Sequence, residues 1–200
     1  MKKFTLNRVA LSLVFAVMVS LGLSGCTNST DTTSSSVTTE VTKTITEKEV
    51  LDIQKQWGEG IVTIGEVYTA GGDYRAAATD HINKFYHYQA GSVLFKPTLA
   101  SVTQFRTDFE GALSYFVGGN EKFAEDSGFA KSWNNVRWES TGVKSIGNMA
   151  VAMGNYYFTP TNGGDDVKVE YSFAYTKNAN DELKIILHDS HFPFVPAATE

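Results

Sequence analysis

Four consecutive polar residues close to the carboxyl end, His188-Asp189-Ser190-His191, are the strongest candidates for chemistry. They continue a strand-like run, and side chains alternate along a strand, so His188 and Ser190 share one face with Ile186. Asp189 and His191 then point to the other face. An imidazole exchanges protons near neutrality, and a neighbouring hydroxyl can orient a water or a small oxyanion. His188 and Ser190 therefore predict a site; the alternative is a strand that emerges into solvent with hydrogen-bonded histidines.

Three helices are expected before that strand. Thr46-Glu47-Lys48-Glu49 has the form of a capping box, so a helix begins there, and its apolar stripe ends near residues 71–72. A second helix is expected over about 73–85. Residues 101–104 repeat the capping-box pattern and predict a third helix that ends at Gly118-Gly119. Its expected buried face consists of Phe105, Phe109, Ala112, Leu113 and Phe116.

The remainder of the chain has the alternation of strands. A short strand is expected at 93–95, and four longer ones follow at 133–143, 149–158, 167–176 and 183–192. Turn residues separate the later strands, as an antiparallel meander requires. Helices followed by a continuous antiparallel sheet predict an α+β fold.

Composition excludes several classes of function. The formal net charge is -5, and the basic residues are scattered, so nucleic-acid binding is not expected. Cys26 is the single cysteine, which excludes an intrachain disulfide and a thiolate metal cluster. Thirteen phenylalanines, nine tyrosines and three tryptophans are available to fill a core or to line a pocket.

The first residues have the order of a secretory signal. Basic residues precede an apolar run from Val9 to Leu23, which is too short for a comfortable membrane-spanning helix. Leu23-Ser24-Gly25-Cys26 resembles the lipobox of bacterial lipoproteins. We therefore expect a signal peptide over 1–25 and a lipid on Cys26; the alternative is an ordinary signal peptide with a chance cysteine.

A Ser/Thr-rich stretch follows the signal. Residues 26–45 are expected to form the lipidated cysteine and a flexible tether, and residues 46–200 the folded domain. Thr27 occupies the position where aspartate favours inner-membrane retention. Attachment to the outer membrane, facing the periplasm, is therefore the expected location.

Several segments together resemble the iota-class carbonic anhydrases. The resemblance runs over about residues 46–194 and is carried by Val93–Thr98, Gln104–Gly119, Val169–Tyr171 and the tetrapeptide at His188. It implies an NTF2-like cone, related to the association domain of calmodulin-dependent kinase II, with N-terminal helices on a curved, mainly antiparallel sheet. The resemblance thus implies the same α+β class as the order of elements.

The resemblance also implies a reaction and its residues. The reaction is reversible hydration of CO2 to bicarbonate, and the matching pocket positions are Thr98, Tyr115, His188 and Ser190, with a tyrosine or histidine relaying the proton. The family's last strand usually ends in His-His-Ser-Ser, so the second and fourth positions differ here. The alternative is an NTF2-like small-molecule-binding or assembly module without catalysis.

No cofactor is expected in this pocket, with zinc or manganese as the alternative. A site with three protein ligands would need His81, His87, His188, His191 or carboxylates, and the last two histidines face opposite ways on a strand. His81 and the aromatic cluster 85–88 are expected at the pocket rim; the alternative is an amphipathic helix end with hydrogen-bonded histidines. The expected partners are CO2 or bicarbonate, a membrane reached through the lipid, and a second copy bound through the outer face of the sheet.

Overall fold

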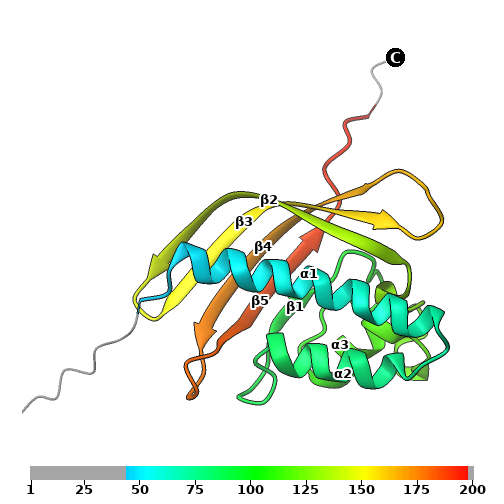
Figure 1. Ribbon diagram of the computed structural model, residues 1–200, viewed down its shortest axis with the longest axis horizontal. Helices are drawn as coiled ribbons and strands as arrows, with labels where there is room; N and C mark the ends of the chain where they lie inside the picture. Colours follow the sequence, from blue (N-terminus) through cyan, green and yellow to red (C-terminus); the bar gives the residue numbers. More distant parts are fainter. Residues whose placement is uncertain (1–43, 198–200) are drawn as a thin grey trace, which may run out of the picture. The chain divides into compact units, whose positions relative to one another are not determined.

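The structure is a computed structural model that describes residues 44–197 (Figure 1). The expected signal peptide, Cys26 and all of the tether up to residue 43 lie outside the described residues. Ile45, expected at the end of the tether, is fully buried, and the Ser145 hydroxyl donates a hydrogen bond to its carbonyl. Ile45 is therefore already part of the folded domain.

The first two helices begin where the sequence predicts. Helix α1 spans Glu47–Thr69, and Thr46 and Glu49 form a reciprocal capping box, with bonds of 3.2 Å and 2.7 Å to each other's amides. Helix α2 spans Tyr74–Phe85 and is capped by Asp73. Both predictions are confirmed, because the capping side chain and the helix are adjacent in sequence.

The expected start of the third helix is wrong. Helix α3 spans Phe109–Val117, with Asp108 as its N-cap and Gly118 at its end. The amides of residues 101–103, which a capping box would have begun to use, instead donate to the carboxylate of Glu125 at 2.7–2.8 Å. A distant acceptor thus holds this segment as a loop, and Phe105 is 62% exposed rather than buried. Two short 3-10 turns follow, Glu121–Phe123 and Phe129–Lys131.

A five-stranded sheet forms the second layer. Its strands are β1 (Leu94–Lys96), β2 (Trp133–Ile146), β3 (Met149–Pro160), β4 (Val167–Lys177) and β5 (Leu183–His191), in the order β1-β5-β4-β3-β2. Strand β1 pairs with β5 in parallel, and every other pair is antiparallel. Figure 1 shows α1 lying across one face of the sheet, with α2 and α3 beside it. The α+β prediction is confirmed.

Aromatic side chains fill the space between the layers. Trp57, on the buried face of α1, has its ring 5.6–6.5 Å from the rings of His81, Phe116, Trp138, Tyr156, Phe158, Phe173 and His188. The next residue, Gly58, lets α1 approach β2: a Cβ there would lie 3.0 Å from that of Val136. Large rings therefore position the polar groups that the core contains.

Within residues 44–197, no helix has both the length and the apolarity needed to cross a membrane.

Candidate active site

Thr98, His188 and Ser190 come together through the one parallel strand pair. Phe95 of β1 lies opposite His188 of β5, so the chain leaving β1 passes the end of β5. The hydroxyls of Thr98 and Ser190 are 2.5 Å apart. This contact joins residues 92 positions apart in the sequence. The resemblance identified both residues, and the tertiary structure places them in direct contact.

His188 and Ser190 share the buried face of β5, as alternation predicts, and both are nearly inaccessible to solvent. The prediction that Ile186 lies on that face is wrong. The register with β4 shifts between Ala174 and Tyr175, so the strand carries an extra residue at this point and Ile185 faces the core. A bulge of this kind reverses the alternation on one side of it.

Tyr115 lies beside the same group. Its side chain is 5% exposed, and its ring packs edge-on against Phe95 and stacks on Phe129. The amide of Leu99 donates to its hydroxyl at 3.4 Å. Burial raises the pKa of Tyr115, while the Leu99 amide and the Thr98 hydroxyl oppose that rise. All four pocket residues implied by the resemblance are therefore neighbours.

Two tyrosines complete the group: Tyr86, which belongs to the aromatic cluster expected near the pocket, and Tyr156, which the sequence did not single out. The Tyr156 hydroxyl, from β3, contacts the hydroxyl of Ser190 and lies 3.2 Å from Nε2 of His188. The Tyr86 hydroxyl, just after α2, lies 2.9 Å from Nδ1 of His188. Each belongs to a run of aromatic residues, in which nothing local distinguishes a site tyrosine from a core tyrosine.

The pocket's titratable groups are held neutral. Burial lowers the pKa of His188 well below its ordinary value, and nearby His81 lowers it further. Burial raises the pKa of Tyr86 and of Tyr156. A site of neutral hydroxyls around a neutral imidazole offers hydrogen bonds to a ligand and no fixed charge.

The two positions that depart from the family motif lie on the other face of β5. Asp189 forms an ion pair with Lys96 at 3.4 Å. His191 is near Glu170 at 3.1 Å and near Asp189 at 3.3 Å. These side chains are partly exposed and do not point toward the buried hydroxyls. The departures at Asp189 and His191 therefore leave the pocket's own residues unchanged.

His81 does not lie at a rim. It is buried in the core, with its ring 4.7 Å from that of Phe85, and neither nitrogen has a hydrogen-bond partner. Burial lowers its pKa to about 3, and Lys84 contributes. His87 is half-buried, and its amide donates to the carbonyl of Ile185. Among residues 44–197, no three side chains of His, Cys, Asp or Glu are grouped so as to hold a metal ion.

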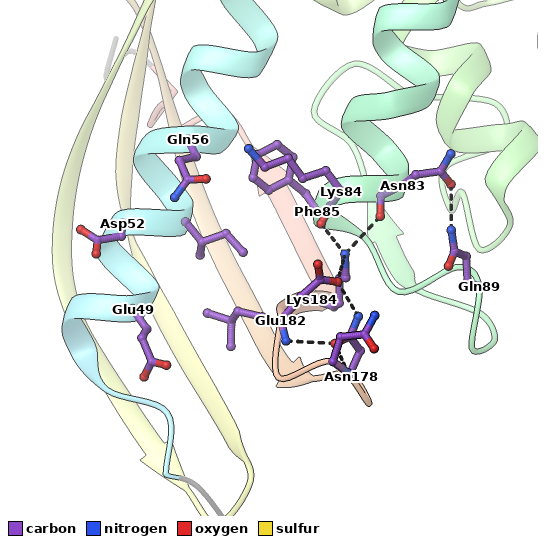
Figure 2. A pocket seen from close by; sticks show the side chains of 13 residues that line it. Glu49, Asp52, Gln56, Asn83, Lys84, Phe85, Gln89, Asn178, Glu182 and Lys184 are labelled. Atoms are coloured by element: carbon purple, nitrogen blue, oxygen red, sulfur yellow. Dashed lines mark hydrogen bonds and ion pairs between the residues drawn. The ribbon is translucent and has the colours of Figure 1, made fainter.

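A separate polar hollow of about 690 Å³ lies between the start of α1, the end of α2 and the β4–β5 turn (Figure 2). Lys184 donates there to the carbonyls of Asn83 and Lys84, and it forms an ion pair with Glu182. These bonds satisfy the last carbonyls of α2, as a cation at a helix end does. None of the pocket residues implied by the resemblance lines this hollow.

The fold and the site together define an α+β domain with a neutral hydrogen-bonding group between its helices and its sheet. A family model described as metal-independent carbonic anhydrase matches residues 48–192. A metal-independent carbonic anhydrase from Nostoc sp. (strain PCC 7120) is 43% identical over 166 residues, which cover 81% of this chain and 80% of the relative. The chain belongs to the metal-independent carbonic anhydrase family.

A solved structure supports the same conclusion. The crystal structure of the iota-carbonic anhydrase from a cyanobacterium, complexed with bicarbonate, matches with a TM-score of 0.75 and 42% identity. The match covers 78% of this chain and 97% of that one. Both the resemblance to the iota class and the fold predicted from it are confirmed.

Proposed function

We propose that this chain catalyses the reversible hydration of CO2 to bicarbonate in the pocket formed by Thr98, Tyr115, His188 and Ser190, without a metal ion. Membership in the metal-independent carbonic anhydrase family supports the reaction. The observation that carries the assignment to these residues is the hydrogen-bonded group around the 2.5 Å contact between Thr98 and Ser190. That group is buried at His188 and opens at the half-buried Thr98.

Hydration of CO2 requires stabilisation of an oxyanion. A water oxygen forms a bond to the carbon of CO2, one C=O electron pair moves onto oxygen, and the water loses a proton. Hydroxyl donors fixed in a dry pocket stabilise the negative charge that develops on the oxygen. The low pKa of His188 makes it a weak proton acceptor, so the released proton leaves toward solvent at the Thr98 end.

Stopped-flow CO2 hydration by the full chain, purified in detergent, tests this function. Thr98→Val and Ser190→Ala should each lower kcat by about 10²- to 10³-fold, the effect of removing one oxyanion donor. Tyr175→Phe is the control, because Tyr175 is buried like Ser190 and its hydroxyl accepts a bond only from Gln54 among the described residues. A folded chain that hydrates CO2 no faster than buffer would favour the non-catalytic binding module instead.

Chelation tests the metal-free part of the proposal. Activity should survive treatment with a strong chelator, and metal analysis of the active protein should find less than one zinc or manganese per chain. Loss of activity on chelation that added zinc or manganese restores would refute a metal-free pocket.

We also propose that the chain acts at the cell envelope, held by a lipid on Cys26 to the outer membrane and facing the periplasm. The lipobox-like residues 23–26 support this location. CO2 crosses membranes freely and bicarbonate does not, so the anchor would place the reaction beside that barrier. Labelled palmitate should enter the wild-type chain and not Cys26→Ser; labelling of both would refute the anchor.

The outer face of the sheet supports a homodimer. It exposes Leu94, Phe105, Val151 and Met153, and it contains two mainly apolar hollows of about 420 and 520 Å³. An apolar face of this extent marks a contact surface, and a second copy of the chain is the proposed occupant. Light scattering should give twice the chain mass for wild type and the single mass for Met153→Lys. A wild-type monomer would refute the proposal.

A further inference from the structure

The pocket hydroxyls belong to a longer chain of hydrogen bonds that begins inside the core. The Trp57 indole nitrogen lies 3.1 Å from the Tyr86 hydroxyl, which in turn lies 2.9 Å from Nδ1 of His188. From Nε2 of His188 the chain continues to Tyr156, then to Ser190, and then to Thr98. One end is the buried Trp57, and the other is the half-buried Thr98.

The buried end of this series of hydrogen bonds, at Trp57, fixes which atom of each pair is the donor. An indole N–H only donates, so Tyr86 must accept from Trp57. Tyr86 then has one hydrogen of its own to place. Its other neighbour within hydrogen-bonding distance is Nδ1 of His188, and the hydroxyl is buried away from water. If Nδ1 carried a proton, Tyr86 would accept twice and leave its own buried donor unpaired, at a cost of about 1–3 kcal/mol.

Tyr86 therefore donates to Nδ1, and this fixes the tautomer of the neutral His188 ring. A neutral imidazole has one donor and one acceptor nitrogen, so the proton is on Nε2. Nε2–H donates to Tyr156, Tyr156 donates to Ser190, and Ser190 donates to Thr98. The Thr98 hydrogen is left for the Tyr115 hydroxyl, whose pKa the Thr98 hydroxyl lowers, or for a ligand.

We propose that Trp57 and Tyr86 are positioning residues that hold His188 in the Nε2–H tautomer and make every hydroxyl of the chain donate toward Thr98. In this orientation the series of hydrogen bonds presents a donor to the bicarbonate oxyanion at its Thr98 end. The same series does not take up the proton that water loses. Each donor in such a chain polarises the next and strengthens it. The role in anion binding depends on the proposed function; the tautomer does not.

Nitrogen NMR of the full chain, labelled with ¹⁵N-histidine and purified in detergent, tests the tautomer without substrate. The His188 signals are identified by their loss in His188→Gln. At neutral pH, Nε2 should carry the proton, and Nδ1 should have the shift of an unprotonated, hydrogen-bonded nitrogen. A proton on Nδ1, or a ring carrying both protons, overturns the proposal.

Tyr86→Phe removes one hydroxyl and keeps the ring. The His188 tautomers should then mix, and titration with ¹³C-bicarbonate should show binding weakened by roughly two- to tenfold, the effect of one hydrogen bond. Tyr175→Phe is the matched control and should change neither measurement. Unchanged tautomer and unchanged bicarbonate binding in Tyr86→Phe overturn the proposal. If hydration activity is absent from a folded wild type, the proposed function fails, and the tautomer and the bicarbonate titration still decide this inference.

Discussion

Arg106→Met removes the only buried guanidinium that holds the loop between β1 and α3, within the described residues. The Arg106 side chain is 0% exposed and lies 2.7 Å from Asp126, which is 2% exposed, and 3.3 Å from Glu125. It also donates to the Thr103 carbonyl at 2.5 Å, and its guanidinium stacks over the Phe123 ring. Removing one partner of a buried pair leaves the other charge uncompensated.

The expected loss of stability is large because Asp126, once its partner Arg106 is removed, is too deeply buried to regain water. Breaking a buried ion pair costs about 3–5 kcal/mol in the free energy of unfolding. For a chain of this size that corresponds to a fall in Tm of roughly 6–20 °C. By contrast, Lys122 and Glu110 are 62% and 57% exposed at 3.3 Å, and such a surface pair contributes about 0–1 kcal/mol.

Denaturant and thermal unfolding of the full chain measure these changes. Lys122→Met is the matched control, since it makes the same chemical change in an exposed ion pair. Adding Asp126→Asn to Arg106→Met should restore part of the loss, because the stranded charge is removed. A loss of under about 1 kcal/mol for Arg106→Met, the size expected for the surface control, would refute a stabilising role of the buried ion pair.

Three further predictions concern the core and the first helix. Because burial lowers the pKa of His81 and of His188, the unfolded chain binds more protons than the folded one below pH 6.5, so stability is lost as pH falls. Each histidine should lower the free energy of unfolding by about 1.4 kcal/mol for each pH unit below 6.5. Unfolding measured between pH 6.5 and 5 should show that His81→Leu removes the contribution of one histidine to this pH dependence. Gly60→Ala should destabilise by about 1–3 kcal/mol in thermal unfolding, because its Cβ would lie 2.3 Å from Nδ1 of His81, and His81→Ala in the same chain should relieve the clash; simple additivity would contradict this. Thr46→Ala should cost about 1 kcal/mol in denaturant unfolding by removing the cap of α1, and no loss would show that the cap is dispensable.

Local signals identified the elements whose determinants are adjacent in the chain. Thr46 and Asp73 cap the helices that they begin, and Gly118 ends the third. The same kind of signal failed at residues 101–104, where the pattern of a cap was present. There the carboxylate of Glu125, more than twenty residues away, takes the amides that a helix would have used. A local pattern cannot report a competing distant acceptor.

The candidate site divides in the same way. The sequence by itself determined that His188 and Ser190 share a strand face, because alternation is a property of the extended backbone. The resemblance added Thr98 and Tyr115, on segments whose placement it did not specify. The bulge that moves Ile186 off the buried face depends on how β5 pairs with β4, and the sequence of β5 alone does not predict it.

Only the tertiary structure decided which groups His188 contacts. Tyr86 and Tyr156 lie 102 and 32 positions from it in the sequence, among other tyrosines of similar surroundings. Burial, which sets the pKa of His188, also depends on packing from several elements at once. The sequence supplied the reactive groups and the face on which they lie; their partners, their protonation and the direction of their hydrogen bonds arise from contacts between distant segments, which short-range patterns do not encode.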